Sequence, residues 1–143
     1  LPTSITSIGN GAFTNCCSLE SIPIPSGVTT FGTNVFSSCY GLKSIPFNNN
    51  MTSIGSTICQ NCYSLVSVTI PSTVTSIGTY AFYFCCGLSS IRFKGTTPPT
   101  VANANAWSNI PTDCKIYVPK GYLTAYTSAN NYPSSSTYTY IEE

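Results

Sequence analysis

Residues 65–85 read LVSVTIPSTVTSIGTYAFYFC, which is most of one copy of a repeat with a period of 23 residues. Three columns of the repeat hold the same residue type in four successive copies. These columns are Gly9, Gly32, Gly55 and Gly78; Cys16, Cys39, Cys62 and Cys85; and Leu19, Leu42, Leu65 and Leu88. A period of about 20–30 residues predicts a solenoid, in which each copy forms one coil and buries its apolar side chains only against neighbouring coils.

Each coil is predicted to contain two extended segments. In the first, the apolar residues Val68 and Ile70 alternate with polar residues, which predicts a short strand with one buried face that ends at Pro71. Stacked copies of this strand would form a parallel main sheet with strands ~4.8 Å apart. The second segment, residues 74–77, is followed by Gly78, which we expect to be a turn residue that is free to adopt a positive φ.

Aromatic rings are predicted to fill the centre of the coils. Phe82 begins a tight turn that should direct its ring into the core, and Phe13 and Phe36 occupy the same column and should also be buried. The third coil has Cys59 in this column, so its packing should be looser unless neighbouring side chains fill the space.

The cysteine column has more than one interpretation. We expect Cys16, Cys39, Cys62 and Cys85 to be free, buried thiols that act as small core hydrophobes. The alternative is a set of disulfides between adjacent coils, since ~4.8 Å lies within the Cα separation that a disulfide tolerates, although parallel side chains give poor bridge geometry. A zinc site is not expected, because these sulfurs form a line and zinc needs four ligands that converge.

The repeat resembles a known family. The pattern Leu-x-x-Ile-x-Ile-Pro-x-x-Val-Thr-x-Ile-Gly-x-x-Ala-Phe-x-x-Cys is similar to the unit of the BspA-like leucine-rich repeats, which occur in surface proteins of anaerobic bacteria and some protists. The resemblance covers residues 1 to about 95. It implies an α/β solenoid: a right-handed leucine-rich-repeat superhelix with 23-residue coils, a parallel main sheet and a C-terminal cap.

The residues after the clear repeats are predicted to close the end of the solenoid. Residues 1–95 form the leucine-rich-repeat coils, which we expect to be truncated at the N-terminus because the chain opens inside the pattern. Residues 96–143 form a degenerate last coil and a C-terminal cap of the same continuous domain. Trp107 should be buried there, Pro119 is suited to open a short helix, and residues 140–141 should add an edge strand.

The composition excludes several classes of partner. Charged residues make up only 6% of the 143 residues, and the net charge is +1. Neither nucleic acid nor an anionic membrane is therefore expected to bind by electrostatic attraction. No apolar run approaches the roughly 18–20 residues that a membrane span needs, so no membrane insertion of this segment is expected. Ser, Thr, Asn and Tyr supply the polarity, which suits an extracellular or cell-surface protein.

The sequence does not predict an enzyme. It contains no histidine, which excludes Ser-His-Asp and Cys-His catalysis and histidine metal sites. The acidic residues Glu20 and Asp113 lie four coils apart, or ~19 Å, which is too far for a pair of catalytic carboxylates. No catalytic residue, metal ligand or cofactor is assigned.

The outward positions of the main strand form the candidate protein-binding surface, named here the strand face. These positions are Glu20, Ser21 and Pro23; Lys43, Ser44 and Pro46; Val66, Ser67 and Thr69; and Ser89, Ser90 and Arg92. Glu20 and Lys43 should lie one above the other, and no aromatic anchor is expected on this face.

The resemblance implies a secreted or cell-surface adhesion module that binds a protein of a host or a neighbouring cell. Two alternatives stay open: a non-binding structural spacer within a larger surface protein, and a glycan-binding module.

Overall fold

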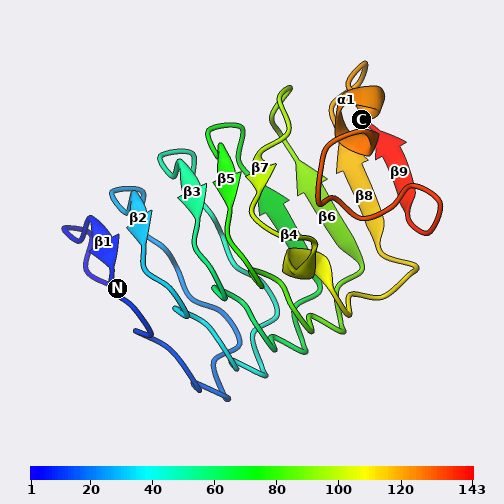
Figure 1. The fold of residues 1–143 in the computed structure, drawn as a ribbon. Coiled ribbons are helices and arrows are strands. Elements are labelled where there is room, and N and C mark those ends of the chain that lie inside the picture. The colour runs from blue at the N-terminus through cyan, green and yellow to red at the C-terminus, as the bar shows by residue number, and fades with distance from the viewer.

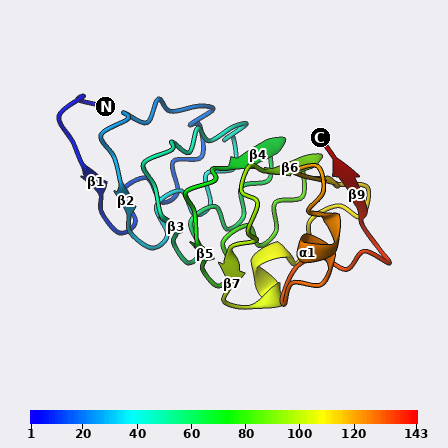
Figure 2. The ribbon, with the colours of Figure 1, turned by 90° about the horizontal axis from the view of Figure 1, so that it is seen from above.

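A computed structural model describes residues 1–143 and shows a row of stacked coils that ends in a cap (Figure 1). The coils carry two sets of parallel strands on opposite sides of the solenoid (Figure 2). The main strands are β4 (Ser67–Ile70), β6 (Ser90–Phe93), β8 (Lys115–Val118) and β9 (Thr139–Glu142). The second segments are β1 (Ser7–Ile8), β2 (Thr30–Phe31), β3 (Ser53–Ile54), β5 (Ser76–Ile77) and β7 (Thr100–Val101).

The register of the strands follows the repeat. The main sheet has the order β4-β6-β8-β9, and β3, β5 and β7 form a second sheet. Ser67 pairs with Ser90, 23 residues later, and Ser90 pairs with Lys115, 25 residues later. The predicted parallel solenoid is therefore confirmed. Its helical content is small, so the expected α/β character is reduced to a 3₁₀ helix, η1 (Ala104–Trp107), and one short α-helix, α1 (Leu123–Thr127).

The main sheet is missing from the first two coils, which the repeat pattern did not predict. The second coil contributes only one isolated bridge, from Ser44 to Ser67. In these coils Pro23 and Pro46 occupy the column that Thr69 holds in β4. Proline has no N–H to donate to a neighbouring strand, so a regular sheet forms only where this column is free of proline.

The expected role of Gly78 is wrong in its reason. Its φ is not positive, because the only glycines with positive φ are Gly11 and Gly121. A Cβ atom on Gly78 would instead lie 2.5 Å from the backbone nitrogen of Ser56 in the preceding coil. This glycine therefore permits close contact between coils. At the equivalent Gly9, where no coil precedes, a Cβ atom would meet nothing within 4 Å.

Left-handed backbone occurs at two other columns of each coil, in the turn that leads from the second segment toward the main strand. The first column holds Gly11, Asn34, Thr57 and Tyr80, and the second holds Asn15, Ser38, Asn61, Phe84 and Asn109, all with φ between 57° and 64°. Most of these residues are glycine, asparagine or small polar residues, which tolerate this conformation best.

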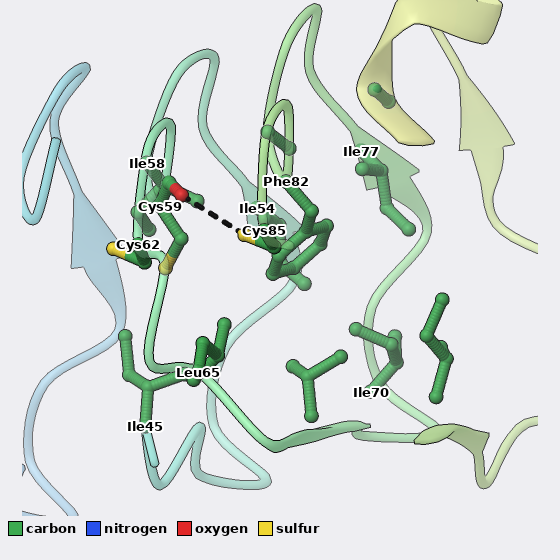
Figure 3. Packing of buried hydrophobic residues seen from close by; sticks show 14 of the residues in the cluster. Ile45, Ile54, Ile58, Cys59, Cys62, Leu65, Ile70, Ile77, Phe82 and Cys85 are labelled. Atoms are coloured by element: carbon green, nitrogen blue, oxygen red, sulfur yellow. Dashed lines mark hydrogen bonds between the residues drawn. The ribbon is translucent and has the colours of Figure 1, made fainter. Parts of the chain in front are cut away.

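The core is one continuous cluster that runs through all coils (Figure 3). Phe36 and Phe82 are fully buried, whereas Phe13 is only partly buried because no coil covers its other side. At Cys59 the missing ring is replaced by Phe47, whose centroid lies 6.2 Å from Phe31 and 6.4 Å from Phe82. A neighbouring side chain thus fills the predicted gap.

All eight cysteines are free thiols. Three members of the cysteine column are buried, but Cys16 is exposed, contrary to expectation, because it belongs to the uncovered first coil. The sulfurs of Cys39, Cys62 and Cys85 donate to backbone carbonyls of the preceding coil at 3.0, 3.1 and 3.2 Å (the last in Figure 3). These thiols therefore also link successive coils.

The cap covers the last coil. Trp107 is 3% exposed and stacks on Phe82 at 5.3 Å, as expected of a closing residue. Tyr126 of α1 is buried and donates its hydroxyl to the carbonyl of Gly95 at 2.7 Å. β9 pairs with β8, so the predicted edge strand is present. Pro119 does not open the helix, which begins only at Leu123.

Candidate functional site

The strand face lies on the outer side of the main strands. Ten of its twelve residues are exposed, and Ser90 and Arg92 are half-buried. The residues beneath them, such as Val68 and Ile70, belong to the core. Alternation along the strand therefore holds these side chains at fixed positions on a rigid, parallel backbone.

The charged groups of the strand face are already paired within the protein. Lys43 Nζ lies 2.8 Å from Glu20 Oε2, as the register predicts, and both side chains are largely exposed. Such a pair contributes little to stability because water screens it.

Arg92 is held by the cap, which the sequence did not indicate. Its Nε lies 2.5 Å from Glu143 Oε1, and its guanidinium lies 4.5 Å from the ring centroid of Tyr117. Lys94 Nζ reaches the same carboxylate at 3.2 Å. The hydrogen bond from Arg92 is the largest cause that lowers the pKa of Glu143, and Lys94 adds to it. These groups line an open, mainly polar hollow at the end of the strand face.

An aromatic pair beside the strand face was missed by the sequence reasoning. The rings of Tyr40 and Tyr63 stack with centroids 5.0 Å apart and planes within 3° of parallel. They are 42% and 46% exposed, and each lies in the turn just before the main strand of its coil. Val66, three residues after Tyr63, is 50% exposed. The 23-residue spacing of the two tyrosines was the signal that could have found them.

The site is suited to binding by surface contact. No group of three or more His, Cys, Asp or Glu side chains comes together in a way that could hold a metal ion. No helix of the protein has the length and apolar character needed to cross a membrane. What the strand face offers is a rigid surface of small polar groups with an aromatic pair at its edge.

Comparison with known proteins identifies the repeat. A family model described as BspA type leucine rich repeat region matches residues 1–112 as six copies. No curated protein matches the chain significantly.

Solved structures show the same solenoid. A leucine rich cell surface protein from Faecalibacterium prausnitzii A2-165 shares 27% identity with a TM-score of 0.79, over 93% of this chain and 34% of that protein. The T. pallidum leucine rich repeat protein shares 22% identity with a TM-score of 0.72, over 83% of this chain and 57% of that protein. The pneumococcal vaccine antigen PcpA shares 17% identity with a TM-score of 0.75, over 99% of this chain and 40% of that protein. The chain thus spans between about a third and somewhat more than half of these proteins.

Proposed function

Because the chain belongs to the family of BspA-type leucine-rich repeats, we propose that it is a secreted or cell-surface module that binds a protein partner through the strand face. The partner is a protein of a host cell or a neighbouring cell, and the module uses no cofactor and catalyses no reaction. The similar F. prausnitzii protein is described as a cell surface protein, which supports the location.

The observation that carries the proposal is the stacked pair of Tyr40 and Tyr63. Aromatic side chains provide much of the binding energy at protein interfaces because they are large, rigid and partly apolar. These two rings already hold each other in place at 5.0 Å, so binding would cost little side-chain entropy. Exposed Val66 adds apolar area next to them.

The rest of the strand face supports a close contact around this anchor. Serine, threonine and proline dominate it, so a partner's backbone can approach without meeting long side chains. The few charges are Glu20, Lys43 and Arg92, and each is paired inside the protein. Affinity would therefore depend on shape and hydrogen bonds more than on charge steering, and salt should affect the association rate little.

The test measures binding to a panel of purified extracellular-matrix and serum proteins immobilised on a biosensor. For any protein of the panel that binds, the double variant Tyr40→Ser/Tyr63→Ser should lose at least about tenfold in affinity, or about 1.4 kcal/mol. The matched control is Ser53→Ala in β3, on the opposite side of the solenoid, which should bind as the parent does.

Equal affinity in the tyrosine variant would contradict the strand-face proposal. If no panel protein binds, and deletion of one coil alters only the reach of a larger surface protein, the chain acts as a structural spacer instead.

A further inference from the structure

One coil departs from the others at three neighbouring columns of its turn. In the preceding coils these columns hold Gly11, Asn34 and Thr57; Thr14, Ser37 and Gln60; and Asn15, Ser38 and Asn61. The coil that contains β5 and β6 holds aromatic residues at all three, namely Tyr80, Tyr83 and Phe84, named here the turn cluster. The next coil returns to polar residues, with Asn105, Ser108 and Asn109.

The backbone does not favour these aromatic residues. Tyr80 and Phe84 both have a φ of 58°, in the left-handed region where bulky side chains are disfavoured. Asparagine, which the neighbouring coils use in these columns, tolerates this conformation better. The fold alone would therefore select against both residues.

Core packing does not account for the turn cluster either. Tyr80 is 37% exposed and Phe84 is 36% exposed, and none of the three residues belongs to the core cluster. Residues that break a local rule without a gain in packing are expected at functional positions.

The three rings form one compact surface. The centroid of Tyr83 lies 5.1 Å from that of Tyr80 and 4.7 Å from that of Phe84, and both contacts are edge-to-face. Because the planes differ, the cluster presents ring faces in more than one direction.

Amide and hydroxyl groups flank these rings from the adjacent coils. Asn105 donates from Nδ2 to the hydroxyl of Tyr80 at 3.3 Å. The backbone N–H of Asn61 bonds to the carbonyl of Tyr83 at 2.8 Å, which places that asparagine's coil directly beside the cluster. No charged residue occurs between Lys43 and Arg92, or from residue 95 to residue 112, so the surroundings are uncharged.

We propose that the turn cluster binds a neutral oligosaccharide. Sugar rings present C–H faces that pack on aromatic faces, and their hydroxyls suit the amides of asparagine and glutamine as donors and acceptors. The uncharged surroundings suit a neutral ligand. The three partly exposed rings offer roughly 200 Å², well short of the roughly 800 Å² per partner of a stable protein interface. This site lies on the turn side and is independent of the strand-face proposal.

The test titrates the protein by calorimetry with maltotetraose, cellotetraose, xylotetraose, mannotetraose and chitotetraose at millimolar concentration. At least one of these sugars should bind. The triple variant Tyr80→Asn/Tyr83→Ser/Phe84→Asn, which restores the residue types of the other coils, should lose at least tenfold in affinity. Because it also relieves the left-handed backbone at two positions, its Tm should stay equal or rise by a few degrees.

The control is the strand-face variant Tyr40→Ser/Tyr63→Ser, which should bind the same sugar with unchanged affinity. Binding of no sugar in the panel, or undiminished binding by the triple variant, would overturn the proposal. A triple variant that loses a protein ligand while the parent binds no sugar would assign the cluster to a protein interface and likewise overturn it.

Discussion

At the scale of single residues, two columns govern how closely the coils approach one another. The glycine column removes a Cβ atom where backbones meet, and the cysteine column places a thiol against a carbonyl of the preceding coil. Both roles need a coil on the N-terminal side. Gly9 and Cys16 have none, and both are exposed.

The glycine column predicts an asymmetric response to the same substitution. Gly78→Ala should destabilise the protein by about 1–3 kcal/mol or more, because its Cβ atom would overlap the backbone of Ser56. Gly9→Ala is the matched control and should be neutral or slightly stabilising, since nothing lies within 4 Å. Urea unfolding of both variants measures the difference. Equal losses would show that the column serves the chain conformation of each coil and not the contact between coils.

The buried thiols predict a loss of stability in alkali. Burial raises the pKa of Cys59 and Cys85 well above 9.0, and that of Cys39 to about 12. An unfolded thiol loses its proton near pH 9 while the folded one keeps it, so stability is full below this pH and falls as pH rises further. Between pH 7 and pH 10, Cys59 and Cys85 should each cost about 1.4 kcal/mol.

This pH dependence is checked by urea unfolding at pH 7 and pH 10 with a reductant present. The variant Cys59→Ala/Cys85→Ala should show a smaller difference between the two pH values than the parent. The same difference in both proteins would exclude the thiols as its source. Tyr126, whose pKa burial raises to about 12, adds a further loss above pH 10 in both proteins.

At the scale of elements, the main sheet and the cap are complementary. β4, β6 and β8 leave an edge that would expose unpaired backbone groups, and β9 covers it while α1 covers the end of the core. The hydroxyl of Tyr126 and the carboxylate of Glu143 attach this cap to Gly95 and Arg92.

Removal of the cap should therefore make the protein aggregate. A chain that ends after Gly95 would uncover Phe82 and Phe93, which are now at most 1% exposed, and would expose the edge of β6. Size-exclusion chromatography and light scattering should show oligomers where the full chain is monodisperse. A soluble, monomeric fragment would contradict the assigned role of the cap.

At the scale of the whole molecule, the solenoid could be predicted because one period carries the register. Every buried column repeats with that period, so the parallel pairing of β4 with β6 follows from the sequence. The weak points were local. Pro23 and Pro46 remove the backbone donors that a regular main sheet needs, and the periodic apolar pattern around them concealed this.

The candidate site was predicted less completely. The outward positions of the strand face follow from alternation, but the contact of Arg92 with Glu143 joins residues 51 apart that share no repeat. The stack of Tyr40 and Tyr63 was visible only as a shared column. The left-handed backbone at Tyr80 could not be seen, because an aromatic residue gives no sign of that conformation.

The central claim is that each coil is stabilised by its neighbours, so stability should follow position along the stack. Four equivalent amides report on it, because each donates to the preceding coil at nearly the same distance: Lys43 at 2.9 Å, Val66 at 3.1 Å, Ser89 at 2.8 Å and Lys115 at 3.0 Å. Hydrogen–deuterium exchange of the native protein, read by NMR, compares them directly. Protection should be lowest at Lys43, which bonds to the uncovered first coil, and should rise through Val66 to Ser89 and stay high at Lys115 beneath the cap. Equal protection at all four amides, or the highest protection at Lys43, would contradict the account.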